Sequence, residues 1–113
     1  MYPSGQWEGF WVQEQFGCQP MTAFTLAFLS GEITGGGKDI IGRFTFTGSY
    51  DIRSGEIVMM KQYIGKHRVL YQGNPDGEGC IQGTWSIGGT SGGFLLRPAV
   101  PRPRGDEPVQ EMG

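Results

Sequence analysis

Four short segments between residues 44 and 87 alternate apolar and polar side chains, and short turns containing glycine separate them. The first, residues 44–50, reads FTFTGSY, and the alternation continues through residues 58–64, 67–72 and 80–87. A period of two with β-branched and aromatic residues predicts strands, and such short turns predict that neighbouring strands are antiparallel. No helical period of useful length appears in the chain. The pattern therefore favours an antiparallel β-sheet.

The turn sequences predict how these strands are registered. Gly65-Lys66 fits a two-residue hairpin loop, whereas Arg53-Ser54-Gly55 and Pro75-Asp76-Gly77 fit type I turns with glycine at a bulge. Together the three turns predict one inward, mostly apolar face, made of Phe44, Phe46, Gly48, Tyr50, Val58, Met60, Gln62, Ile64, His67, Val69, Tyr71, Ile81, Gly83, Trp85 and Ile87. The predicted outward face is mostly polar, as expected for a sheet buried on one side.

Further alternating segments lie near Trp7, Phe24 and Phe94, and residues 32–35 are a candidate short strand, which gives seven or eight strands. A meander with one apolar face can bury that face by closing on itself. We therefore predict an all-β fold, a single antiparallel up-and-down β-barrel, over residues 1–97. From Pro98 the composition becomes rich in proline and charge, so residues 98–113 are predicted to be a disordered tail. Its Arg104-Gly105-Asp106 tripeptide is interpreted as coincidence.

Composition argues against several classes of function. A net charge of −2 gives no reason to expect nucleic acid or anionic membrane as a partner, and no apolar run approaches the roughly 20 residues of a membrane helix. The chain begins without a secretory leader pattern, so a cytoplasmic protein is expected. Two distant cysteines and one histidine predict no metal centre and no cofactor.

The glycine-rich stretch SGEITGGGKDIIGRF, residues 30–44, does not fit a phosphate-binding loop, because its spacing is wrong and a strand follows where a helix is needed. It is predicted instead to be a loop that enters a strand. The register places it at the same barrel end as the Gly65-Lys66 turn and residues 88–93. Glycine keeps loops pliant, so we expect this end to be the mouth, with a lid or rim formed by Gly36, Gly37, Lys38 and Asp39.

Two polar residues, Gln62 and His67, interrupt the predicted inward face near this mouth. Apolar walls with a few convergent polar groups are typical of small-molecule pockets. We therefore predict a non-catalytic site for a compact apolar or aromatic molecule, contacted by Phe44, Phe46, Gln62, His67, Tyr71 and Trp85. An equally weighted interpretation is that His67 caps the rim in water and Gln62 bonds to backbone or to a buried water.

Two alternative functions stay open. A filled barrel would favour an assembly module, which could form a homo-oligomer through an outward stripe made of Met59, Tyr63 and Leu70. An isomerase or cyclase would need an acid–base pair in the cavity. The only neighbour that the register offers to His67 is Asp39, and such a pair at a rim is more often a salt link.

Short motifs near the N-terminus resemble those of the calycin barrels. Gly5-Gln6-Trp7 and Gly9-Phe10-Trp11 both read Gly-x-Trp, as in lipocalins, and Met21-Thr22 followed by residues 31–35, GEITG, resembles the avidins. The resemblance covers about the first third of the chain and implies an eight-stranded barrel with a ligand cavity at one end. The biotin-contacting positions of avidins are not matched, because an asparagine is replaced by Gly9 or Gln13 and a tyrosine by residues 36–38, GGK.

Overall fold

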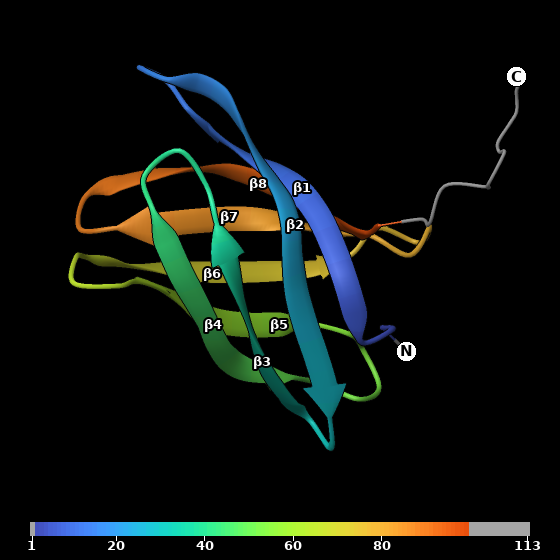
Figure 1. Ribbon diagram of the computed structural model, residues 1–113. Helices are drawn as coiled ribbons and strands as arrows, with labels where there is room; N and C mark the ends of the chain where they lie inside the picture. Colours follow the sequence, from blue (N-terminus) through green and yellow to red (C-terminus); the bar gives the residue numbers. More distant parts are fainter. Residues whose placement is uncertain (1, 100–113) are drawn as a thin grey trace, which may run out of the picture.

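The computed structural model describes residues 2–99 and shows a closed antiparallel barrel of eight strands (Figure 1). The strands are β1 (Gly5–Gln13), β2 (Gly17–Leu29), β3 (Glu32–Lys38), β4 (Arg43–Tyr50), β5 (Ile57–Tyr63), β6 (Arg68–Pro75), β7 (Ile81–Ile87) and β8 (Thr90–Pro98). Each strand pairs with the next, and β8 pairs back with β1. The predicted all-β up-and-down barrel is thus confirmed. Residues 100–113 of the predicted tail lie outside the described residues.

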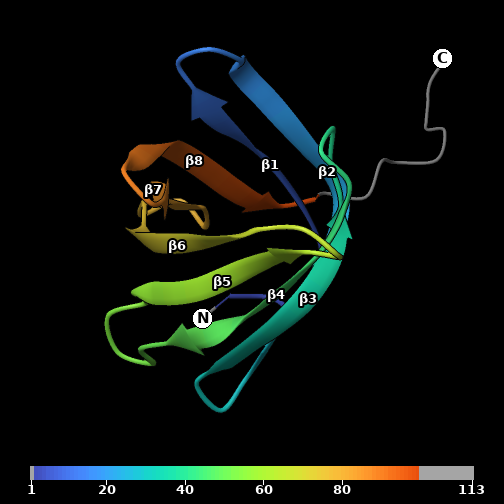
Figure 2. The ribbon, with the colours of Figure 1, turned by 90° about the vertical axis from the view of Figure 1, so that its left-hand side faces the viewer.

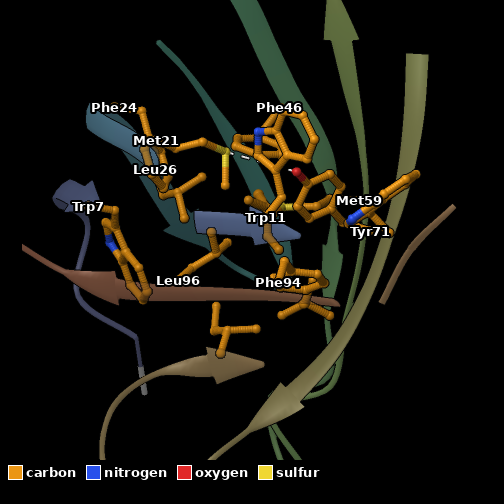
Figure 3. Close-up of a cluster of buried hydrophobic side chains, with 14 of the residues drawn as sticks. Trp7, Trp11, Met21, Phe24, Leu26, Phe46, Met59, Tyr71, Phe94 and Leu96 are labelled. Atoms are coloured by element: carbon orange, nitrogen blue, oxygen red, sulfur yellow. Dashed lines mark hydrogen bonds between the residues drawn. The ribbon is translucent and has the colours of Figure 1, made fainter. Parts of the chain in front are cut away.

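Large side chains fill the middle of the barrel (Figure 3). The ring of Tyr71 lies 5.4 Å from that of Phe46 and 4.6 Å from that of Phe94, centroid to centroid. Phe46 also packs against Phe24 at 5.8 Å. An eight-stranded barrel is just wide enough for its own side chains to fill it, and this core follows that rule. Within residues 2–99, no helix is long and apolar enough to cross a membrane.

The N-terminal segment seals one end of the barrel. Tyr2 is buried there, packs against the rings of Trp7 and Phe28, and donates its hydroxyl to the carbonyl oxygen of Gly55 at 2.6 Å. The β2–β3, β4–β5 and β6–β7 connections lie at this closed end. The other four connections lie at the opposite, open end, and the β1–β2 hairpin reaches beyond the other strands (Figure 1, Figure 2).

Strand β5 is turned over relative to the sequence prediction. Ile57, Met59, Lys61 and Tyr63 point into the barrel and are buried, so the predicted inward placement of Val58, Met60, Gln62 and Ile64 was wrong. Met59 and Tyr63 were predicted to face outward and are each only 2% exposed, so of the predicted outward stripe only Leu70 lies at the surface, half-buried. The predicted association surface made of Met59, Tyr63 and Leu70 therefore does not exist.

Turn lengths explain this correction. In the β4–β5 connection, the N–H of Asp51 donates to the carbonyl oxygen of Glu56, which closes a four-residue loop where three were predicted. In the β5–β6 connection, the N–H of Tyr63 donates to the carbonyl oxygen of His67, which closes a three-residue loop where two were predicted. A slip of one residue reverses every side chain of a strand. Because β5 slipped by one against both neighbours, β4 and β6 kept their predicted faces.

The β6–β7 register was also predicted wrongly, but with no change of face. Tyr71 lies opposite Trp85 rather than Ile81, because the connection is a five-residue loop over residues 76–80. The carboxylate of Asp76 accepts the N–H groups of Glu78 and Cys80 and thereby stabilises that longer loop. The shift is an even number of residues, so Trp85 still points inward.

Residues 35–37, the three glycines of SGEITGGGKDIIGRF, are part of β3; all three pair with β4, and Gly35 and Gly36 also pair with β2. The prediction of a pliant loop at this place was wrong. A Cβ atom at Gly35 would collide with the carbonyl oxygen of Thr25, and one at Gly37 would collide with the Cβ atom of Phe24. The glycines therefore allow β2 and β3 to approach closely. A strand without side chains shows no alternation, which is why the sequence pattern did not reveal it.

Candidate functional site at the open end

A small cavity opens at the end of the barrel opposite Tyr2. Its volume is about 60 Å³, counted as the space that the centre of a water molecule can occupy. Since one water needs roughly 10–15 Å³ by that measure, there is room for a few waters or one compact group. The cavity is lined by Trp11, Gln13, Ile41, Tyr63, His67, Val69, Tyr71, Trp85 and Ile87.

Two tryptophans form one wall of the cavity and are held in place by hydrogen bonds. The rings of Trp11 and Trp85 meet edge to face at 6.2 Å. The Nε1 of Trp85 donates to the carbonyl oxygen of Val12 at 2.9 Å, and the Nε1 of Trp11 donates to Asp39 at 3.3 Å. Since both indole N–H groups have partners within the protein, the faces left for a ligand are apolar.

An ion pair is buried next to the cavity. The Nζ of Lys61, on β5, lies 2.6 Å from Oδ2 of Asp39, in the β3–β4 connection, and the two side chains are 1% and 0% exposed. Three cavity-lining residues, Trp11, Tyr63 and Tyr71, contact this pair through their polar atoms. The walls of the cavity are therefore positioned by the ion pair.

Asp39 is the hub of this network. Its Oδ2 accepts hydrogen bonds from Lys61, from the hydroxyl of Tyr63 at 2.6 Å and from the indole of Trp11. Its Oδ1 accepts the backbone N–H groups of Ile41 at 2.9 Å and Gly42 at 3.4 Å. One carboxylate thus joins the β3–β4 loop to β1 and β5, with its hydrogen-bonding capacity well used.

Aromatic rings surround the ammonium group of Lys61. Its Nζ lies 4.4 Å from the ring centroid of Phe44 and 4.7 Å from that of Tyr63, within the range of cation–π attraction. It also lies 3.4 Å from the hydroxyl of Tyr71 and 3.2 Å from the sulfur of Met21. Apart from Asp39, every one of these neighbours is neutral.

Burial sets the protonation behaviour of the cluster. Burial lowers the pKa of Lys61 to about 8, although the hydrogen bond and the charge of Asp39 act in the opposite direction. Burial alone would raise the pKa of Asp39, but hydrogen bonds from Lys61 and Tyr63 outweigh it and lower that pKa. The pKa of Tyr63 is raised by burial and by its bond to Asp39. At neutral pH the pair is therefore ionised, and Tyr63 keeps its proton.

The predicted ligand-contact residues separate into three groups. His67, Tyr71 and Trp85 come together at the cavity. Phe44 and Phe46 point into the barrel but pack in its core, 5.2 Å apart, away from the cavity lining. Gln62 points outward, and its Nε2 donates to the carbonyl oxygens of Tyr63 and Lys66, so its predicted place in the pocket was wrong. Its backbone bonds agree with the alternative interpretation of Gln62.

The predicted lid also differs from the structure. Gly36 and Gly37 lie within β3, and Lys38 ends that strand at the surface. Asp39 is at the open end as predicted, but its side chain is buried, so it is not a rim charge. Its partner is Lys61 rather than His67.

Several site residues were not found from the sequence. The reversed face of β5 hid Lys61 and Tyr63, and the long alternating strand around Trp11 gave no sign of which end was open. The sequence did contain one signal for these residues: Lys61 lies two residues from both Met59 and Tyr63, so the three share one face of β5.

Within residues 2–99, no group of three or more His, Cys, Asp or Glu side chains is arranged to hold a metal ion. Comparison of the chain with known protein families, with characterised proteins and with solved structures finds no match. The candidate function therefore has to be argued from the site itself.

Proposed function

We propose that this protein binds a compact apolar or aromatic molecule in the cavity at the open end of its barrel. The observation that carries the proposal is the cavity itself, which combines aromatic and aliphatic walls with two polar residues, Gln13 and His67. Pockets for small molecules generally have this composition. The volume of about 60 Å³ restricts the bound part to a group near the size of one ring.

Preorganisation supports binding by this cavity. Trp85 is fixed by the carbonyl of Val12, whereas Trp11 and Tyr63 are fixed by the buried carboxylate of Asp39. Walls that are already ordered lose little conformational entropy when a ligand enters, which favours affinity. We propose binding rather than catalysis, because the carboxylate of Asp39 and the ammonium group of Lys61 are paired with each other.

The resemblance to avidins agrees with a ligand at one end of an eight-stranded barrel. We propose an avidin-like mode of binding in this general sense only. Gly9, Gln13 and residues 36–38 do not match the biotin-contacting pattern, so the proposed ligand is not biotin.

Nuclear magnetic resonance of the three indole N–H groups tests the proposal directly. Trp11 and Trp85 line the cavity, whereas Trp7 lies near the closed end, where its Nε1 donates to Pro3, and serves as an internal reference. Titration with a panel of compact neutral aromatics, such as phenol and phenylacetamide, is expected to move the Trp11 and Trp85 signals and to leave Trp7 unchanged.

A matched pair of valine variants provides the control. Val69→Phe places a ring into the cavity and is expected to abolish the ligand-induced shifts. Val58→Phe makes the same change on the outer side of the neighbouring strand, where Val58 is 47% exposed, and should preserve them. If no compound of the panel moves either signal at millimolar concentration in the unchanged protein, the proposal is refuted.

A second candidate function is self-association through the open end, which the filled middle of the barrel favours. Three of the connections at this end carry a large exposed apolar side chain. These are Phe16, Ile40 and Ile64, which are 59%, 75% and 61% exposed. Leu29 and Ile52 are exposed at the closed end, so the open end carries the larger number of such residues, and exposed apolar groups are common at interaction surfaces. Sedimentation of the full chain at increasing concentration should then show a dimer that Ile40→Ser with Ile64→Ser weakens. A monomer at all concentrations would exclude this candidate.

A further inference from the structure

Charged side chains are separated between the two ends of the barrel. At or next to the open end the exposed charged residues are basic, with Glu14 as the exception: Lys38, Arg43, Lys66 and Arg68. At or next to the closed end they are mostly acidic, namely Glu32, Asp51, Glu56 and Glu78, with the half-buried Asp76 beside them; Arg53 and Arg97 are the exceptions, and Arg97 is paired with Glu8. Although the net charge is −2, the open end, where the cavity lies, therefore has a positive rim, made of Lys38, Arg43, Lys66 and Arg68.

The basic residues of this rim are not neutralised within the described chain. The ion pairs of residues 2–99 are Lys61 with Asp39 and Arg97 with Glu8, so the four rim residues form none. Lys38 and Arg43 lie directly opposite each other on β3 and β4. Like charges at such positions repel and destabilise a sheet, and a bound anion would relieve that repulsion.

Two neighbouring residues, Lys66 and His67, connect the rim with the cavity itself. The Nζ of Lys66 donates to the carbonyl oxygen of Ile41 at 2.8 Å, and Ile41 lines the cavity. The next residue, His67, lines the cavity as well, with its ring 5.0 Å from that of Tyr63. A polar end of a ligand that leaves the cavity beside Ile41 and His67 therefore lies near the ammonium group of Lys66.

We propose that the ligand of this cavity is an acid, with its apolar or aromatic body among Trp11, Trp85 and Val69 and its carboxylate at the basic rim. The inference rests on the proposed function and names the class of ligand that this site takes. A positive rim attracts an anion from solution, raises its rate of association and excludes cations of the same shape.

Aromatic walls alone would also suit a cationic ligand, which is the main competing class. Here the ammonium of Lys61 already lies among these rings, 5.9 Å from the centroid of Trp11 and 5.6 Å from that of Tyr71. Its charge is balanced by Asp39, but it already occupies the space next to these rings, and a second cation would be repelled by the rim. The geometry therefore favours an anion over a cation.

Three probes of one shape separate the classes: phenylacetate, phenylacetamide and phenethylamine, which are negative, neutral and positive. With the indole signals of Trp11 and Trp85 as the readout, phenylacetate is expected to bind at least five-fold more tightly than phenylacetamide at low salt, and phenethylamine most weakly. Added salt should reduce the preference for phenylacetate, because exposed charges are screened.

Two arginine variants locate the effect. Arg43→Glu reverses a charge at the open end, and Arg53→Glu makes the same change at the closed end. A unit charge about 8 Å away in water changes affinity roughly two-fold at low salt, so reversal at Arg43 should weaken phenylacetate roughly five-fold. Binding of phenylacetamide should stay the same in both variants, and binding of phenylacetate should stay the same in Arg53→Glu.

The outcomes are distinct. Equal affinity for the three probes, or preference for phenethylamine, overturns the inference about the acid and leaves the proposed binding function standing. Equal effects of Arg43→Glu and Arg53→Glu on phenylacetate also overturn it. Binding of none of the probes counts against the proposed function itself, and the inference falls with it.

Discussion

The buried pair of Asp39 and Lys61 makes a quantitative prediction about stability. In Asp39→Asn the ammonium group of Lys61, 1% exposed, keeps only neutral neighbours such as Tyr71 and Met21. Removing one partner of a buried ion pair typically costs about 3–5 kcal/mol of unfolding free energy, because the other charge is left uncompensated. We expect Asp39→Asn to lie in the upper half of that range.

Lys61→Met should cost less than Asp39→Asn. The carboxylate of Asp39 would retain hydrogen bonds from Tyr63, Trp11 and the backbone of its own loop, so a cost of about 3 kcal/mol is expected. The double variant leaves no unpaired charge. Its cost should fall short of the sum of the single costs by about 2–3 kcal/mol, the upper part of the range of about 0.5–3 kcal/mol for residues in contact.

Urea unfolding followed by tryptophan fluorescence measures these costs, since Trp7, Trp11 and Trp85 are all buried. With a urea dependence of about 1–1.5 kcal/mol per molar, a loss of 3 kcal/mol lowers the midpoint by about 2–3 M. Glu8→Gln is the control. Its carboxylate pairs with Arg97 at the surface, with side chains 37% and 59% exposed, and such pairs contribute at most about 1 kcal/mol.

Additive costs in the double variant would refute the reasoning, and so would single costs below about 1 kcal/mol. If the single variants do not fold at all, Tyr63→Phe still tests the network. It removes one donor to Asp39 and is expected to cost about 1–2 kcal/mol. No measurable cost for Tyr63→Phe would show that the hydrogen bonds around Asp39 do not stabilise the barrel.

Two further predictions concern pH and backbone packing. Because the pKa of Lys61 is about 8 when folded and 10.5 when unfolded, the unfolded chain binds more protons between these values, so stability should rise with pH from about 8. The raised pKa of Tyr63 changes stability in the opposite direction, so stability should fall again above about pH 10. Urea midpoints measured from pH 7 to 10 should show the rise in stability, and Lys61→Met should lack it. Gly35→Ala should destabilise or prevent folding because its Cβ atom collides with backbone, whereas Gly89→Ala, with open space around it, should be neutral; thermal midpoints of the two variants compare them directly.

The antiparallel barrel could be predicted because alternation and short turns are local properties of the sequence. The face of β5 could not, since its two phases are almost equally apolar: Ile57, Met59 and Tyr63 in one, Val58, Met60 and Ile64 in the other. The difference between the phases is Lys61 against Gln62, and burying a glutamine costs less than burying a lysine. Turn lengths had to decide, and one-residue errors in two turns reversed the strand.

The candidate site was half predicted for the same reason. Tyr71 is on β6, His67 directly precedes β6 and Trp85 is on β7, and both strands kept their predicted faces. The partners of Asp39, in contrast, are on β1 and on the reversed β5. Hydrogen bonds that an aspartate accepts from residues 22 and 24 positions away leave no local pattern in the sequence. Only the tertiary structure brings them together.

The register of β5 and the ion pair imply each other. If β5 slipped by one residue, Gln62 would turn inward and Lys61 would turn to solvent, and Asp39 would stay buried beside Trp11 without a counter-charge. A buried carboxylate in that position is costly, so the pair disfavours the slipped register even though the two apolar phases of β5 barely distinguish it. The ion pair therefore selects the face of β5 that brings Tyr63 to the cavity. By this reasoning the barrel obtains the wall of its open-end cavity and its unique register from the same two charged residues.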